Sequence, residues 1–544
     1  MLERIDFAEK KTKKKGYKEE RKALMDQLVL LQQQAREAQV GFVVLFEGWD
    51  GAGKGSRLSD LLYLMDARAT SVHLTKDRPA DETELFSRLE TGVTSFDPLM
   101  KEFWQALGER GTVTFYDCGW YHAGVEQIIE TEHERHLAKA KKKAENPRVG
   151  AKKLVKAAMK PREDLNGHSR LDICLESIES FERALTDNGY VVIKFFAHIT
   201  ARTQFDRLMD RYANSDVRWL SEREILNLGE YDAFYELQDY MLEQTDYTFA
   251  PWHVLNGEDK RGANLDIART LVSEMQAALE AKREKDAQPK VTEGAAPALS
   301  RYPITPDYPL LENVEHDLVL NLDDYREQLE VEQELLHNLE LQMYQQRVPM
   351  MLMFEGWDAA GKGGSIKRVA QALDARAYNI FPSPAPTKAE LAHPHLWRYW
   401  TRLPKAGHVG IYDRSWYGRV LVERVEGLAS HEEWSRAYDE INEFERDMIE
   451  WGAILIKFWV NISEDEQLNR FKARQEDPQK QWKITDEDWR NREKNPQYAE
   501  AIQDMFRLTS TTYAPWTILE SDNKQYARIK ALRTINDALE ARLN

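Results

Sequence analysis

The stretch that decides the fold occurs twice in this chain. Residues 46–54 read FEGWDGAGK, and residues 354–362 read FEGWDAAGK, so each copy fits the pattern G-x-x-x-x-G-K. Each copy follows a short apolar run, Phe42–Phe46 or Met350–Phe354, and precedes a helical pattern. A buried strand, a glycine loop and a helix in this order indicate a phosphate-binding loop, because the backbone N–H groups at the helix N-terminus surround phosphate oxygens.

The repeat continues beyond the glycine loop, so the chain holds two copies of one domain. Four further segments of the first half match segments of the second: FYDCGWY (115–121) and IYDRSWY (411–417), ESFERAL (179–185) and NEFERDM (442–448), VVIKFFAHIT (191–200) and ILIKFWVNIS (454–463), and TFAPWHVL (248–255) and TYAPWTIL (512–519). Strands that alternate with long helices predict an α/β fold, with a doubly wound parallel sheet in each half. The first half also carries an insertion, which we place in Thr131–Asp164.

A stretch rich in proline, alanine and charge separates the two halves. Residues 282–309 read KREKDAQPKVTEGAAPALSRYPITPDYP and show no apolar periodicity, which is typical of a linker. We therefore predict an N-terminal domain over residues 1–285, a linker over 286–309 and a C-terminal domain over 310–544.

Composition and charge exclude several classes of protein. The chain has 544 residues, a formal net charge of −17 at pH 7, and hydrophobic and charged shares of 42% and 31%, which are typical of a globular protein. The negative charge argues against a nucleic-acid partner, because duplex affinity comes mostly from cationic side chains. The sequence shows no signal peptide and no apolar run of the ~18 residues that span a bilayer, so we expect no membrane association. The two cysteines, Cys118 and Cys174, fit neither a disulfide framework nor a metal motif, which favours the reducing cytoplasm.

The second copy of the glycine loop carries the residues expected to bind phosphate. Gly361, Gly363 and Gly364 permit close approach of the backbone, and Lys362 supplies a mobile positive charge. The Ser or Thr that usually follows this lysine and binds Mg²⁺ is replaced by Gly363. We expect Asp358, inside the loop, to take over that role, since one or two carboxylates plus substrate phosphates usually hold Mg²⁺. Alternatively, Asp358 caps the following helix or braces the loop.

A second acidic group ends the apolar strand in the motif IYDRSWYGR, residues 411–419. A carboxylate at the end of a strand beside a P-loop is typical of a second metal anchor, which here is Asp413. Arg414 and Arg419 follow it, and guanidinium groups neutralise a transferring phosphoryl group or clamp an anionic substrate. The alternative is an ordinary ion pair at the protein surface.

A polar segment, residues 473–489, lies between the last two predicted strands, where nucleotide kinases carry a mobile lid. In it, Lys480 and Lys483 flank Trp482. Closing a lid excludes water, which favours transfer to an acceptor over hydrolysis. The alternative is a pair of solvated helices without such a role.

Together, the motifs FEGWDAAGKGG, YDRSWYGR, EFER, PQKQWKIT and TSTTYAPW resemble the polyphosphate kinase 2 family over essentially all of both halves. The tandem arrangement resembles the class that moves the terminal phosphoryl group of inorganic polyphosphate to AMP, giving ADP. The resemblance implies two fused P-loop kinase domains with helical lids, dependence on Mg²⁺ or Mn²⁺, a cytoplasmic location and assembly into a homo-oligomer. It also implies roles for the residues that match family motifs: Asp358, Lys362, Asp413, Arg414 and Arg446 in catalysis, and Lys480, Lys483 and Arg376 in phosphate binding.

The first half keeps the glycine loop but loses both arginines of the second motif. In its version, YDCGWYHA, Cys118 and Ala123 replace them. The functional positions that it keeps are Asp50, Lys54, Asp117 and Arg183. Because arginines of this kind stabilise charge in the transition state, we predict little or no catalysis in the first half.

Two other functions fit parts of the pattern. An ATP-dependent nucleoside monophosphate kinase shares the P-loop, the Asp-Arg pair and the lid, but the glycine at position 363 and the duplication count against it. A phosphate- or nucleotide-binding module without turnover needs only the loop, and the full set of charged residues in the second half counts against that reading.

Overall fold

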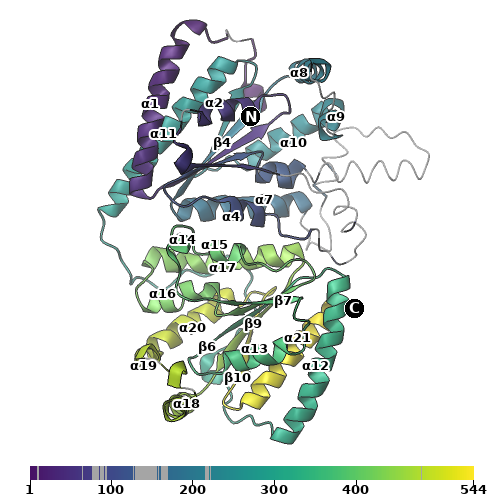
Figure 1. Ribbon diagram of the computed structural model, residues 1–544, viewed down its shortest axis with the longest axis vertical. Helices are drawn as coiled ribbons and strands as arrows, with labels where there is room; N and C mark the ends of the chain where they lie inside the picture. The colour runs from purple at the N-terminus through teal and green to yellow at the C-terminus, as the bar shows by residue number, and fades with distance from the viewer. Residues whose placement is uncertain are drawn as a thin grey trace, which may run out of the picture. The chain divides into compact units, whose positions relative to one another are not determined.

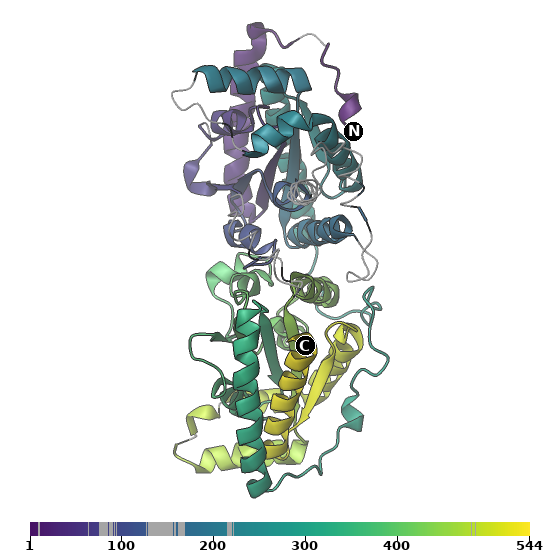
Figure 2. The ribbon, with the colours of Figure 1, turned by 90° about the vertical axis from the view of Figure 1, so that its right-hand side faces the viewer.

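The computed structural model divides the chain into two compact units, each built around a parallel β-sheet (Figure 1, Figure 2). The first unit consists mainly of Met1–Asp77 and Glu102–Pro289, and the second mainly of Lys290–Leu391 and His395–Asn544. The structure describes residues 1–8, 11–63, 65–75, 85, 91, 93, 95–126, 128, 156, 159–160, 169–214, 220, 222–479, 481–484 and 486–543. Most of the predicted insertion therefore lies outside the described residues.

Within the described residues, the first unit holds a five-stranded sheet with the order β2-β3-β1-β4-β5, and all neighbouring strands are parallel. The strands are β1 (Gly41–Gly48), β2 (Thr70–Leu74), β3 (Val113–Asp117), β4 (Tyr190–His198) and β5 (Trp252–Asn256). The main helices are α1 (Lys14–Ala38), α2 (Lys54–Leu62), α4 (Lys101–Ala106), α7 (Arg170–Asp187), α8 (Ala201–Asn214), α9 (Glu222–Gly229), α10 (Tyr231–Gln244) and α11 (Lys260–Asp286). In Figure 1, α1 and α11 lie side by side on one face of the sheet, and α4 and α7 lie on the other.

The second unit repeats this architecture. Its described part holds a five-stranded parallel sheet with the order β10-β9-β6-β8-β7. Read from the other edge, this is the order of the first sheet, with each strand replaced by its counterpart. The strands are β6 (Met350–Gly356), β7 (Tyr378–Pro382), β8 (Val409–Asp413), β9 (Ile454–Asn461) and β10 (Trp516–Glu520). The main helices are α12 (Leu322–Gln345), α13 (Lys362–Ala370), α17 (His431–Trp451), α18 (Glu464–Glu476), α19 (Asp486–Glu493), α20 (Asn495–Thr509) and α21 (Lys524–Leu543). The prediction of a doubly wound parallel sheet in each half is confirmed.

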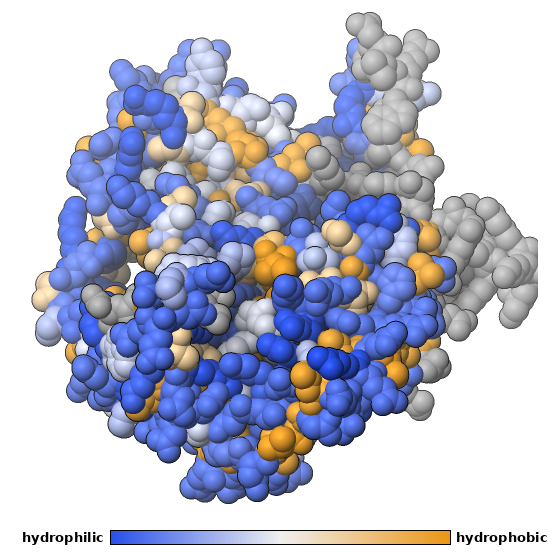
Figure 3. Space-filling model, turned by 60° about the horizontal axis from the view of Figure 1, so that its bottom comes forward, coloured by the Kyte–Doolittle hydropathy of each residue, from blue (hydrophilic) through white to orange (hydrophobic). Residues whose placement is uncertain are grey.

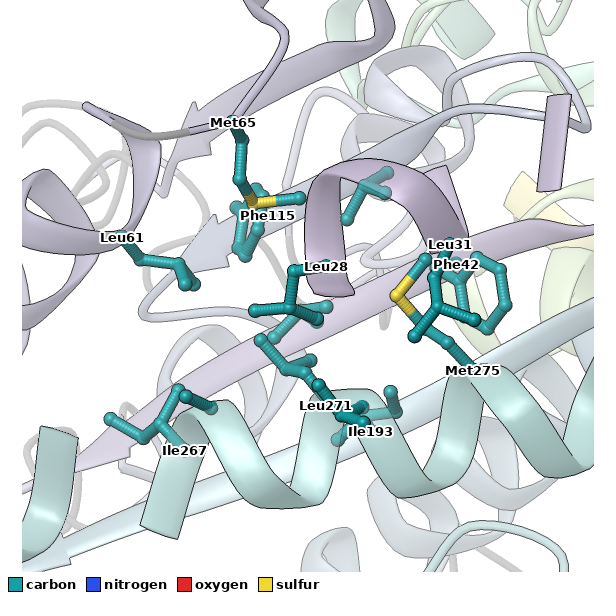
Figure 4. Close-up of a cluster of buried hydrophobic side chains, with 14 of the residues drawn as sticks. Leu28, Leu31, Phe42, Leu61, Met65, Phe115, Ile193, Ile267, Leu271 and Met275 are labelled. Carbon is teal, nitrogen blue, oxygen red and sulfur yellow. The ribbon is translucent and has the colours of Figure 1, made fainter. Parts of the chain in front are cut away.

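The core of the first unit lies between its central strand and the helix pair α1 and α11 (Figure 4). Leu28 of α1 and Leu271 of α11 pack in the same cluster as Phe42 of β1, and none of the three is more than 2% exposed. β1 is buried along its whole length. Helices cover both faces of this strand, which explains why its sequence reads as one apolar run and does not alternate.

The region that joins the units is more ordered than its composition predicts. α11 continues to Asp286, and Lys282 and Asp286 form an ion pair one turn apart at its C-terminal end. Further along, Arg301 pairs with Glu443, and Ile304 forms an isolated antiparallel bridge with Thr511. The second half of the predicted linker is therefore bound to the second unit.

No helix of the described part is both long and apolar enough to cross a membrane. The face shown in Figure 3 is mainly hydrophilic, with apolar residues scattered among polar ones. Single apolar side chains of this kind are normal on a protein surface.

The tryptophan that follows the first glycine of each P-loop donates its hydrogen bond to a different partner in each unit. In the first unit, Trp49 Nε1 donates a hydrogen bond to His198 Nδ1 at 2.9 Å. In the second, Trp357 Nε1 donates to Asn461 Oδ1 at the same distance. Burial lowers the pKa of His198 from 6.5 to about 4, so the ring is neutral in the folded unit and can accept this bond.

We expect this histidine to make the first unit sensitive to acid. The unfolded chain takes up a proton near pH 6.5 and the folded unit only near pH 4, so the free energy of unfolding should fall as pH drops through that range, by up to about 3 kcal/mol. His198→Asn copies the second unit and should remove the effect. Calorimetric unfolding at pH 7 and pH 5 checks this, and equal pH dependence in the wild type and the variant would contradict it.

Candidate active site

The P-loop of the second unit joins β6 to α13 and surrounds the ammonium group of Lys362. Gly361, directly before α13, has a φ of +111°, which residues with side chains rarely adopt. Lys362 Nζ donates hydrogen bonds to the carbonyl oxygens of Gly356 at 2.6 Å and Trp357 at 3.1 Å. Burial lowers the pKa of Lys362, while Asp358 acts in the opposite direction. The loop thus holds a cation beside a helix N-terminus, where anions bind.

Arg414 reaches from the end of β8 back to the P-loop. Its backbone has a φ of +62°, which is uncommon for a residue other than glycine and turns the chain directly after the strand. Its Nη2 lies 3.1 Å from Asp358 Oδ1, and Asn491 Nδ2 donates to Asp358 Oδ2 at 2.9 Å. Burial alone would raise the pKa of Asp358, but its neighbours, Lys362 first among them, hold it below the usual value. Asp358 is therefore ionised, as a metal ligand must be.

Asp358 and Asp413 are two of the three carboxylates whose charge acts on the lysine of this loop, and Glu355 is the third. Asp413 ends β8, and both carboxylates act to raise the pKa of Lys362. In the part of the chain that the structure describes, no three His, Cys, Asp or Glu side chains form a metal-binding group. Two carboxylates, completed by phosphate oxygens and water, match the way in which Mg²⁺ is held in kinases. We refer to Asp358, Lys362, Asp413 and Arg414 as the P-loop site.

Arg419 lies on the same loop as Arg414 but is turned toward another carboxylate. It ends the short helix η6 (Trp416–Arg419), and its Nη1 lies 3.1 Å from Glu423 Oε2. Its side chain is largely buried and adds to the effect of burial in lowering the pKa of His395. The charge of Arg419 is thus partly neutralised by Glu423.

Two of the predicted arginines contact other groups. Arg376 lies just before the first residue of β7, whereas the P-loop follows the last residue of β6. The Nη2 atom of Arg376 lies 2.7 Å from Asp374 Oδ2. Arg446 of α17 lies 5.5 Å from the ring centre of Tyr302, and its Nε lies 3.7 Å from Glu450 Oε1. In its described part, the structure therefore brings neither arginine into contact with the P-loop site, and their roles in phosphate binding and catalysis stay predictions.

The two lysines of the predicted lid are not placed by the structure. Lys480 lies outside the described residues, and Lys483 ends the short helix η7 (Gln481–Lys483) with its side chain also outside them. The described part of the predicted lid segment, residues 473–489, takes in the end of α18, η7 and the start of α19, between β9 and β10.

Motif reading missed Glu355, the second residue of FEGWD. Its buried carboxylate accepts hydrogen bonds from the backbone N–H of Ser415 at 2.7 Å and from the Ser415 hydroxyl at 2.8 Å. Burial raises the pKa of Glu355, and the bonds from Ser415 oppose this. In the first unit, Glu47 likewise accepts a bond from the backbone N–H of Gly119 at 2.8 Å. The glutamate thus fixes the turn after β8, or after β3 in the first unit. Its presence in both copies of the motif was the sequence signal that could have indicated this role.

A buried ion pair supports the same turn from the body of the second unit. Lys457 of β9 and Glu445 of α17 lie 2.7 Å apart, and both side chains are 0% exposed. Glu445 Oε1 also accepts bonds from Trp416 Nε1 at 3.0 Å and from the Tyr417 hydroxyl at 2.7 Å. The first unit repeats the arrangement with Lys194, Glu182, Trp120 and Tyr121. The glutamate of the shared FER segment is therefore structural, and the loop that carries Arg414 rests on it.

The first unit keeps the loop geometry without the arginine. Lys54 Nζ lies 3.7 Å from Asp50 Oδ1, and burial raises the pKa of Asp117. Cys118 takes a φ of +57°, the same turn as in the second unit. A thiol therefore occupies the position from which a guanidinium group contacts Asp358 in the second unit.

Comparison with known proteins places this architecture in a family. The family model for polyphosphate kinase 2 (PPK2) matches residues 11–159, 156–283 and 319–544. The chain belongs to the polyphosphate kinase 2 family. A protein of this family from Pseudomonas aeruginosa, named polyphosphate:AMP phosphotransferase, is 38% identical over 534 residues, which cover 98% of this chain and 97% of that protein.

Two further matches also run along both units of the chain. A protein from Pseudomonas syringae pv. tomato with the same name is 36% identical over 524 residues, which cover 96% of this chain and 94% of that protein. A crystal structure described as polyphosphate kinase 2 from Pseudomonas aeruginosa has a TM-score of 0.77 and 35% identity, and the match covers 100% of this chain and 99% of that one. This polyphosphate kinase 2 family member therefore shares its two-unit architecture with the Pseudomonas aeruginosa structure.

Proposed function

We propose that this polyphosphate kinase 2 family member transfers the terminal phosphoryl group of inorganic polyphosphate to AMP, giving ADP and a polyphosphate chain one unit shorter. The contact of Arg414 with the P-loop aspartate, beside the half-buried Lys362, is the observation that carries the proposal. It puts two cations next to a loop built to hold phosphate. The names of two relatives that match along both units support the choice of donor and acceptor.

The chemistry is an in-line displacement at phosphorus. An oxygen of the AMP phosphate attacks the terminal phosphorus of the donor, and the bond to the bridging oxygen breaks, so the shortened chain leaves with the electron pair. The attacking oxygen is already anionic at neutral pH, and no strong general base is needed. Lys362 and Arg414 stabilise the negative charge on the transferring group, and the loop positions it.

Asp358 and Asp413 would hold the divalent cation, Mg²⁺ or Mn²⁺, in this proposal. The bound ion supplies positive charge that neutralises the phosphate oxygens. The residues fit this group, because Asp358 is kept ionised by its neighbours and Asp413 lies at the end of the adjacent strand.

Several cationic side chains lie near the start of α13, where they can bind a long polyanion. Arg528 Nη2 lies 2.9 Å from the position that a Cβ atom would take at Gly364, so this glycine leaves room for the guanidinium group. Burial lowers the pKa of Lys524 at the start of α21, and the charges of Arg470 and Arg528 add to this effect. A local excess of cations on an acidic protein favours a polyanionic donor.

The division of labour between the domains is part of the proposal. The C-terminal domain, residues 310–544, carries the reaction, and the N-terminal domain, residues 1–285, is a degenerate copy joined to it by residues 286–309. We further propose a cytoplasmic location, assembly into a homo-oligomer, and no nucleic-acid or membrane partner. The family resemblance supports these points, and the absence of a disulfide at Cys118 and Cys174 in the described residues fits a reducing compartment.

The choice of donor is tested by product analysis of the purified protein with AMP and Mg²⁺. We expect ADP to form with polyphosphate and only at background level with ATP as donor. ADP formation from ATP alone would favour a nucleoside monophosphate kinase instead. Binding of either donor without any product would favour a binding module.

A further inference from the structure

The lid region and the P-loop of the second unit are tied together by one asparagine. Asn491 lies on α19, and its Nδ2 donates a hydrogen bond to Asp358 Oδ2 at 2.9 Å. Arg414 donates a hydrogen bond to the other oxygen of this carboxylate, Asp358 Oδ1. The carboxylate of Asp358 therefore joins three elements: the P-loop, the turn after β8 and α19. A movement of α19 away from the loop must break the bond from Asn491.

A second connection runs beside the first. Gln467 of α18 donates through Nε2 to the backbone carbonyl oxygen of Asp358 at 3.2 Å. Its own side-chain oxygen accepts bonds from Arg492 Nη1 at 2.7 Å and from Asn495 Nδ2 at 3.4 Å. The residues on both sides of the α19–α20 junction therefore contact the P-loop through Gln467, whereas Asn491 contacts it directly.

The first unit has kept the same bond. Asn227 lies on α9, the counterpart of α19, and its Nδ2 donates to Asp50 Oδ2 at 2.9 Å. The two helix sequences, EREILNLG and DEDWRNRE, share only this asparagine at matching positions. Cys118 replaces the arginine in the first unit, so the asparagine bond does not depend on an Arg–Asp ion pair. The same asparagine therefore joins this helix to the P-loop aspartate in both copies.

We infer that Asn491 is a positioning residue that holds α19 on Asp358 and so keeps water out of the P-loop site during transfer. This inference rests on the proposed function. A lid that is held closed over a donor favours attack by the acceptor, and a loosened lid admits water as a competing nucleophile. The amide suits this task, since it donates to an ionised carboxylate without adding a charge beside the metal ligand.

The test compares Asn491→Ala with a matched variant in the first unit, Asn227→Ala, in the full-length protein. The first readout is hydrogen exchange of the backbone amides, measured by mass spectrometry without substrate. Asn491→Ala should speed exchange in residues 486–493 by about tenfold while the unfolding temperature stays within the error of the wild type. Asn227→Ala should leave the rate of hydrogen exchange in residues 486–493 unchanged.

The second readout is the fate of the phosphoryl group with polyphosphate, AMP and Mg²⁺. Asn491→Ala should lower the kcat for ADP formation about tenfold and raise the share of phosphoryl groups released as inorganic phosphate. Unchanged exchange in residues 486–493, or a loss of ADP with no added phosphate release, would overturn the inference. Failure of the wild type to make ADP from polyphosphate would instead overturn the proposed function, and the exchange experiment would still decide whether Asn491 holds the lid helix.

Discussion

Arg414→Ala is expected to lower the kcat for ADP formation by a factor on the order of 10³, which corresponds to about 4 kcal/mol in activation free energy. Arg414 follows Asp413 in the sequence, and its Nη2 lies 3.1 Å from Asp358 Oδ1. From this position its guanidinium group can neutralise the negative charge that develops on the transferring phosphoryl group. Because this charge is greatest in the transition state, kcat should fall much more than KM rises. Steady-state kinetics with polyphosphate and AMP measure the effect.

Two variants serve as controls for this prediction. Arg414→Lys keeps a positive charge without the planar fork of donors and should retain part of the activity. Cys118→Ala changes the matching position of the first unit, which has nearly the same φ, and should leave ADP formation unchanged. A kcat within tenfold of the wild type for Arg414→Ala would show that this arginine does not stabilise the transition state.

The second large effect is expected on stability. Glu445→Ala removes the partner of Lys457, and both side chains are fully buried. An ammonium group left unpaired in the interior typically costs about 3–5 kcal/mol, so the second unit should lose most of its stability. The bonds from Trp416 and Tyr417 are lost at the same time, which loosens the loop that carries Arg414.

Denaturant unfolding at neutral pH, followed separately for each unit by hydrogen exchange, measures this loss. Glu182→Ala breaks the equivalent pair of the first unit and should destabilise that unit to a similar extent. The double variant Glu445→Leu/Lys457→Met replaces the pair by apolar side chains and should recover much of the stability. A loss below about 1 kcal/mol for Glu445→Ala would mean that water or another group already compensates the lysine.

Much of this structure could be predicted from local sequence. The strand, glycine loop and helix around Lys362 follow from a continuous apolar run, glycines and a helical pattern, which are short-range signals. The turn that follows Asp413 was also visible, because the strand ends in an acidic residue and an arginine comes next. The presence of two copies strengthened this prediction, because a chance match to G-x-x-x-x-G-K would not recur between an apolar run and a helical pattern.

The parts that could not be predicted depend on tertiary contacts. Asn491 lies far from Asp358 in the sequence, and its neighbours on α19 give no sign that it faces the P-loop. Arg376 and Arg446 belong to recognisable segments, but which way a side chain points depends on helix and strand packing. The contacts of Arg301 and Ile304 could not be predicted either, because their partners Glu443 and Thr511 lie far away in the sequence.

The central claim is that the second P-loop, and not the first, carries the transfer from polyphosphate to AMP. The most direct measurement is ADP formation by the wild type, Lys362→Ala and Lys54→Ala, each with polyphosphate, AMP and Mg²⁺. We predict that Lys362→Ala abolishes ADP formation and that Lys54→Ala, which changes the matching lysine of the first unit, leaves it within about twofold of the wild type. Loss of activity in Lys54→Ala with a folded protein, or full activity in Lys362→Ala, would contradict the claim.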